Sequence, residues 1–125
     1  MDSGRALNAG YGLARIGFGI FASSAPTRMG RTWVGGDAER PGATVILRAL
    51  GLRDIALGSG TLAAALRGDA SDWLAVSMIS DLGDAAATLI GRNEIGSRGV
   101  AITAGVAGAG ALGAALLLAA ERSRA

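Results

Sequence analysis

One uninterrupted apolar stretch constrains this chain more than any other feature of its sequence. Residues Gly99 to Ala120 read GVAITAGVAGAGALGAALLLAA, which is 22 residues without a charge, a proline or a side-chain amide. A helix that rises about 1.5 Å per residue would cross the roughly 30 Å hydrocarbon core of a bilayer over this length. A soluble fold of this size rarely buries a helix that is apolar on every side. The stretch therefore predicts a membrane span.

Three further segments have the length and apolar character of spans, although charges interrupt each of them. With the first stretch they cover about residues 5–24, 43–66, 71–90 and 99–120. Pro41 suits the first turn of the second helix, and Asp72 suits the N-cap of the third. The sequence therefore predicts an all-α fold, a polytopic membrane protein with a four-helix transmembrane bundle, in which residues 1–125 form a single transmembrane domain.

The connections between these helices predict how they are arranged. Residues 23–42 form the longest connection, and Trp33 within it suits a loop half-immersed at the membrane surface. The other two connections are short, so the last three helices should be antiparallel neighbours. A cleaved signal peptide is an alternative interpretation of the N-terminus, because residues 22–24 faintly resemble a cleavage site. Arg15, in the middle of the apolar region such a peptide would need, argues against it.

The composition excludes much chemistry. The chain has no His and no Cys, and all 12 of its basic residues are Arg. A thiolate nucleophile, an imidazole base and Cys- or His-ligated zinc, haem or iron–sulfur centres are therefore ruled out. The arginines are scattered and aromatic residues make up only 4% of the chain, so nucleic-acid binding is not expected. We expect no catalytic residue, no metal site and no cofactor.

Charged residues near the middle of the predicted spans form what we call the charge cluster. Its members are Arg15, Arg48, Arg53, Asp54, Asp81 and Asp84. A charge at the centre of a lone span costs about 2.5–3.5 kcal/mol, so the second helix, which holds three of them, needs neighbours that pair its charges. Three arginines and three aspartates sum to zero, and an arginine can bind a carboxylate through two hydrogen bonds. Asp81 and Asp84, which share a helix face with Ser77 and Thr88, are the expected acceptors.

Two interpretations of the charge cluster compete. Ionisable groups inside a membrane often mark a proton or ion path. The cluster can instead be structural, with ion pairs that fix how the helices fit together. The balanced charge favours the structural role, because a carboxylate paired with arginine stays ionised and carries no proton.

The last helix has a face made only of small residues. It consists of Ala101, Ala104, Gly108, Ala111 and Ala115. Small residues let helix backbones approach closely in lipid, so this face predicts a helix–helix contact. The contact could lie within the bundle or with a partner protein.

Three short motifs resemble a known family. The run Arg48-Ala-Leu-Gly-Leu-Arg-Asp54, followed by Asp81-Leu-Gly-Asp84, and Leu13-Ala-Arg15-Ile-Gly17, followed by Pro26, resemble small four-helix integral membrane proteins common in actinobacteria. The resemblance covers roughly residues 8–92 and implies fold and location, but no activity. In its length and its lack of catalytic groups, the chain is also similar to a small accessory subunit of mycobacterial Mce-type lipid importers. This similarity implies a position beside a permease.

These observations predict a non-enzymatic protein of the inner (plasma) membrane that crosses it several times. The expected function is that of an accessory or structural subunit of a larger membrane complex, in contact with a permease-type subunit and the lipid bilayer, and the complex could be a lipid-import ABC-type transporter. The alternative is a small proton- or ion-coupled transporter or channel that uses Asp81 and Asp84 at the membrane midplane. A membrane enzyme is a third and weaker possibility, because no second group is placed to assist an aspartate.

Overall fold

The computed structural model describes residues 1–124, and over that range the chain is helical without any strand. The elements are α1 (Ser3–Ser24), α2 (Pro26–Val34), a short 3-10 helix η1 (Gly35–Glu39), α3 (Pro41–Arg67), α4 (Ser71–Ile90) and α5 (Ser97–Arg122). The four long helices differ from the predicted segments by no more than two residues at either end. The all-α prediction is therefore confirmed.

Within residues 1–124, three helices are long and apolar enough to cross a membrane, namely α3, α4 and α5. At about 1.5 Å per residue, α5 alone is about 39 Å long. Helix α1 has the necessary length but is not among these three, and Arg5, Asn8 and Arg15 interrupt its apolar residues. The prediction of a membrane protein is thus supported by three apolar spans rather than by four.

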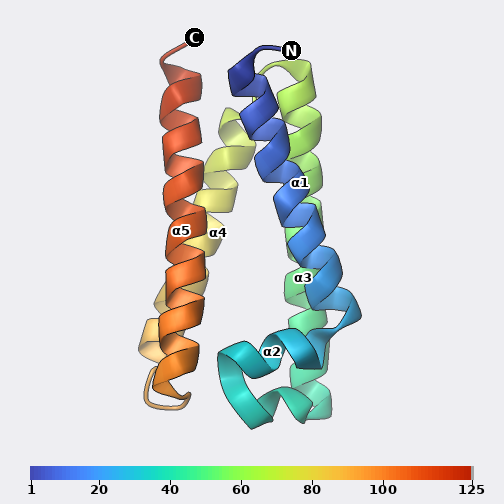
Figure 1. Ribbon diagram of the computed structural model, residues 1–125, viewed down its shortest axis with the longest axis vertical. Helices are drawn as coiled ribbons and strands as arrows, with labels where there is room; N and C mark the ends of the chain where they lie inside the picture. The colour runs from blue at the N-terminus through green and yellow to red at the C-terminus, as the bar shows by residue number, and fades with distance from the viewer. Residues whose placement is uncertain (125) are drawn as a thin grey trace.

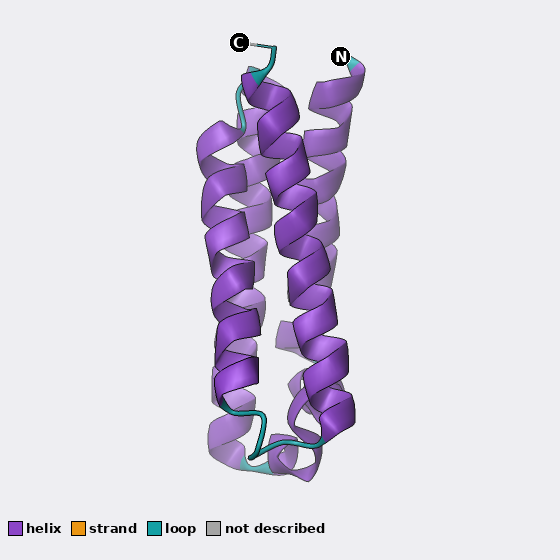
Figure 2. Ribbon diagram, turned by 90° about the vertical axis from the view of Figure 1, so that its left-hand side faces the viewer, coloured by secondary structure: helices purple, strands orange, loops and turns teal. Residues whose placement is uncertain are grey.

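The long helices are arranged as two pairs that run the length of the molecule (Figures 1 and 2). Helix α1 packs along α3, and α4 packs along α5. The chain passes from one pair to the other through a tight turn at Gly68, which has a left-handed φ of 108° and donates its backbone N–H to the carbonyls of Ala64 and Ala65. The expectation that the last three helices are all close neighbours is wrong for α3, because its main partner is α1.

Glycines bring α1 and α3 into backbone contact. Gly12 faces Gly58, and Gly19 faces Gly51, so each helix contributes two glycines spaced seven residues apart. A β-carbon at Gly12 would lie 2.7 Å from the carbonyl oxygen of Gly58, and one at Gly19 would lie 2.5 Å from that of Gly51. These positions leave no room for any side chain, which gives the pair a close-packed interface suited to lipid.

The hydrophobic core is small and lies where the four long helices converge near the chain termini. Leu74 of α4 and Leu118 of α5 pack there against alanines of α1 and α3. The other end of the molecule is closed differently. The predicted loop over residues 23–42 instead contains α2 and η1, because Pro26 suits the first turn of a helix and Gly35, at a φ of 65°, ends it. In Figure 1, α2 lies across this end of the bundle, between the two pairs.

Candidate functional site

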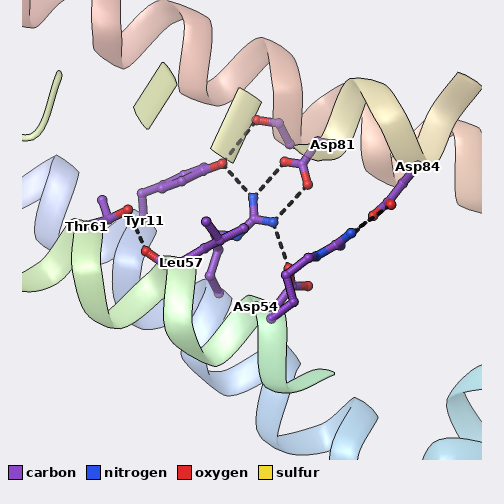
Figure 3. Close-up of polar contacts among 9 residues, drawn as sticks. Tyr11, Asp54, Leu57, Thr61, Asp81 and Asp84 are labelled. Carbon is purple, nitrogen blue, oxygen red and sulfur yellow. Dashed lines mark hydrogen bonds and ion pairs between the residues drawn. The ribbon is translucent and has the colours of Figure 1, made fainter. Parts of the chain in front are cut away.

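Arg15 of α1 is the centre of a polar site buried between the two helix pairs. Its guanidinium donates two hydrogen bonds to the Asp81 carboxylate of α4, with N···O distances of 2.8 and 2.9 Å, and a third of 2.8 Å to Asp54 of α3. A fourth, of 3.0 Å, reaches the hydroxyl of Tyr11 one turn away on the same helix. Figure 3 shows the side chains of Asp54, Asp81 and Tyr11 converging on one point from three helices. Arg15, which is only 9% exposed, therefore joins α1, α3 and α4.

Arg53 makes a second ion pair next to the first. It donates two hydrogen bonds to the Asp84 carboxylate, with N···O distances of 3.0 and 2.6 Å, and a longer one of 3.4 Å to Asp54. Asp54 thus accepts hydrogen bonds from both arginines through the same oxygen, Oδ1. We call Arg15, Arg53, Asp54, Asp81 and Asp84 the charge network.

Arg48, the sixth predicted member of the charge cluster, lies outside this network. Its side chain is exposed, and its Nε donates to the backbone carbonyl of Ser23 at the end of α1, 3.3 Å away. The predicted neutral balance of three arginines and three aspartates is therefore wrong. The network holds two arginines and three aspartates, a formal charge of −1 when all three carboxyls are ionised. Arg48 does not join the network because it lies more than a helical turn along α3 from Arg53, toward the α2 end.

The fifth helix takes part through its backbone. Tyr11 donates a hydrogen bond of 3.4 Å to the carbonyl of Gly110 in α5. A β-carbon at Gly110 would lie 2.5 Å from Oδ2 of Asp81, so a glycine here is what allows the carboxylate to lie against α5. On α4 the predicted polar face lies in the interior, since Ser77, Asp81 and Thr88 are all buried. The network therefore lies at a junction of all four long helices.

A cleft of about 430 Å³ adjoins the charge network. All five α-helices contribute to its walls, which are mostly apolar, and Phe18, Phe21, Met29 and Trp33 supply the largest of its uncharged side chains. All five residues of the charge network also line it. Trp33 of α2 is held at the end of the cleft by a hydrogen bond of 3.1 Å from its Nε1 to the hydroxyl of Thr88. The predicted half-immersed Trp33 is thus fixed against α4.

A second buried polar group, which the sequence did not suggest as a site, lies at the end of the molecule near the termini. Glu121 of α5 is 8% exposed, and its carboxylate accepts hydrogen bonds from the Asn8 amide (2.8 Å), the backbone N–H of Ala70 (3.2 Å) and Arg124 (2.6 Å). It joins α1, the start of α4 and α5. Asn8, an amide within an otherwise apolar part of α1, is the sequence signal that could have revealed it.

The predicted small-residue face of α5 is divided between the inside and the outside of the bundle. Ala111 is buried, Ala104 and Ala115 are partly buried, and Ala101 and Gly108 are exposed. The face that packs inside the bundle is rotated from the predicted one and is formed by Ala107, Ala111, Ala114 and Leu118.

Within residues 1–124, no three His, Cys, Asp or Glu side chains are grouped so that they could hold a metal ion. The site is thus an ion-paired junction beside an apolar cleft, an arrangement that can hold helices together, hold a charge, or do both. No family model, no curated protein and no solved structure matches the chain.

Proposed function

We propose that the chain is a multi-pass protein of the inner (plasma) membrane, that α1 is its fourth span, and that it serves as a non-catalytic accessory subunit of a larger membrane complex. The position of Arg15 supports a fourth span. A lone arginine at the centre of a span costs about 2.5–3.5 kcal/mol, but here two carboxylates accept hydrogen bonds from it inside the bundle. The polarity of α1 is thus directed inward.

The proposed partner binds the outer surface of α5. Only 17% of the most apolar stretch of this helix is buried, the lowest share among the three apolar spans. Gly105 and Gly108 are exposed, and a β-carbon at either would meet nothing within 4 Å. Exposed glycines destabilise a helix by about 1 kcal/mol relative to alanine, and in lipid they suit the close approach of another helix. A permease-type subunit with a complementary small-residue helix is the partner we propose.

The class of complex follows from resemblance alone. The size of the chain and its lack of catalytic groups fit an accessory subunit of a lipid-import ABC-type transporter, such as the Mce-type importers of mycobacteria. Such a subunit would contact the permease through α5 and the bilayer through the remaining surfaces.

Purification from native membranes in mild detergent, followed by mass spectrometry, tests this proposal. We expect a permease-type protein to be recovered with the chain, and Gly108→Ile to abolish its recovery because the branched side chain keeps the helices apart. Gly83→Ile is the matched control, since Gly83 of α4 also has nothing within 4 Å of its added β-carbon. Recovery of the unaltered chain only as a free monomer or homo-oligomer would refute an accessory function.

A second candidate function is a small proton- or ion-coupled transporter that uses Asp81 and Asp84. The observation that favours it is the formal charge of −1 in the charge network, which leaves one positive charge to be supplied. In liposomes, the unaltered protein should carry a flux that Asp81→Asn or Asp84→Asn abolishes. Correctly folded protein without any flux would exclude this function.

A further inference from the structure

The cleft beside the charge network has the chemistry of a binding site for an organic cation. Its volume of about 430 Å³ falls within the roughly 300–1,000 Å³ of pockets that bind small molecules. Phe18 and Phe21, which are 44% and 41% exposed, contribute aromatic rings to its lining. Aromatic faces attract positive charge, and this attraction grows where water is excluded.

The electrostatics of the site select the sign of the ligand. The two arginines of the charge network leave one of its three carboxylates uncompensated. Both oxygens of Asp81 and both of Asp84 accept hydrogen bonds from an arginine. Asp54 uses only Oδ1, and among residues 1–124 no donor reaches its Oδ2. Asp54 is 5% exposed and lines the cleft, and it is the one carboxylate of the three with an oxygen that accepts no hydrogen bond within residues 1–124.

The number of carboxylate oxygens left free to ligate a cation in the cleft indicates which kind of cation fits. A bare metal ion such as Mg²⁺ or Ca²⁺ requires about six or more oxygen ligands, and the cleft offers one carboxylate oxygen that is not already used. With all three carboxyls ionised, the formal charge of −1 on the network disfavours an anion. A single positive charge carried on an apolar body matches both the charge of −1 and the aromatic walls.

We propose that the cleft between the helix pairs binds one monovalent organic cation, whose charge lies against Asp54 and whose apolar groups lie against Phe18, Phe21 and Trp33. The proposal requires neither a partner protein nor transport. It is an equilibrium property of the isolated chain, so its failure leaves both proposals made above standing, and their failure leaves it standing.

Two ions of equal shape and opposite charge provide the test on unaltered protein. Tetraphenylphosphonium and tetraphenylborate are added to the purified protein in detergent, and binding is followed by quenching of Trp33 fluorescence in a Trp73→Phe background. We expect saturable quenching by the phosphonium at one ion per chain and none by the borate. Equal binding of both ions, or no saturable binding of the phosphonium by folded protein, would overturn the proposal.

A pair of isosteric variants then tests the position of the charge. Asp54→Asn keeps the size of the side chain, leaves both bidentate ion pairs in place and brings the network to neutrality, so we expect at least a tenfold rise in the Kd of the phosphonium. Asp72→Asn makes the same chemical change at an exposed position of α4 and should leave the Kd unchanged. An unchanged Kd in folded Asp54→Asn would contradict the assignment. If that variant does not fold, Phe18→Ala replaces it, with an expected rise in Kd of at least threefold.

Discussion

The two interfaces that hold this molecule together are built on opposite principles. Between α1 and α3, four glycines bring the backbones into direct contact. Between the two helix pairs a cleft of about 430 Å³ remains, and Arg15 and Arg53 of the first pair reach across to Asp81 and Asp84 of the second. The first interface depends on shape and the second on charge.

This difference predicts which substitutions each interface can tolerate. In lipid, helix association draws on close packing and on polar groups, because the solvent is as apolar as the side chains. A glycine interface should therefore fail when size is added. A charged interface with an adjoining cleft should accept added size but fail when a charge is removed. Four predictions, from the largest expected effect to the smallest, set these two interfaces against each other.

Removal of the central guanidinium should have the largest effect. Arg15→Ala leaves Asp54 and Asp81 without their principal donor inside the bundle, and breaking a buried ion pair in this way costs about 3–5 kcal/mol. We expect a large loss of folded protein, measured by size-exclusion chromatography in detergent. Arg48→Ala is the matched control, since Arg48 is exposed and only donates to a backbone carbonyl. Equal losses in both variants would show that the network does not hold the pairs together.

Addition of one methyl group to the glycine interface should have the second largest effect. In Gly12→Ala the new β-carbon would lie 2.7 Å from the carbonyl oxygen of Gly58, so the helices must separate, at a cost of about 1–3 kcal/mol. Gly17→Ala, on the same helix but with nothing within 4 Å, should be neutral or slightly stabilising. The midpoint of thermal unfolding in detergent compares the two variants. A lower midpoint for Gly17→Ala than for Gly12→Ala would refute the close contact.

Loss of the hydrogen bond at the α2 end of the cleft should destabilise the fold less than either change above. Trp33→Phe keeps an aromatic ring but removes the N–H that reaches Thr88, a contribution of about 1 kcal/mol. Trp73→Phe serves as the control, because Trp73 packs on Gly60 at the other end of the molecule. We expect a lower unfolding midpoint for the first variant and faster limited proteolysis between residues 26 and 40. Unchanged proteolysis would mean that Trp33 does not anchor α2.

Added size in the cleft should have the smallest effect. Ala14 is exposed and lines the cleft, so Ala14→Leu places new methyl groups in free space and should change the free energy of unfolding by less than about 0.5 kcal/mol. The same unfolding measurement as for Gly12→Ala applies. A destabilisation as large as that of Gly12→Ala would remove the distinction between the two interfaces.

Periodicity and length predicted the helices well, but not how they pair. Uncharged runs such as residues 99–120 have few alternatives in lipid, so their boundaries follow from the sequence. Pairing depends on which small residues meet, and a chain with 21 glycines offers many equivalent faces. The contact of Gly12 with Gly58 and the rotation of the α5 face toward Ala107 could not be selected from among them. Helix α2 was predicted as a loop because its nine residues are too few for a clear periodic signal.

The sequence predicted most of the charged residues of the site but not all of its contacts. Arg15, Arg53 and the three aspartates were identified because charges in apolar helices require partners, and the structure brings these five together. Arg48 was included wrongly, because it lies more than a helical turn from Arg53 on α3 and its side chain turns to the end of α1. Tyr11 and Gly110 gave no signal, because a hydroxyl and a glycine are common in such helices.

The tight turn at residues 68–70 has a consequence for how the molecule is made. It is the one covalent link between the α1–α3 pair and the α4–α5 pair over the range that the structure describes. Toward the charge network, the first pair contributes Arg15, Arg53 and Asp54, a charge of +1, and the second contributes Asp81 and Asp84, a charge of −2. The two halves are hairpins of consecutive sequence with opposite charge. A chain cut at this turn and produced as two peptides should reassemble in the membrane.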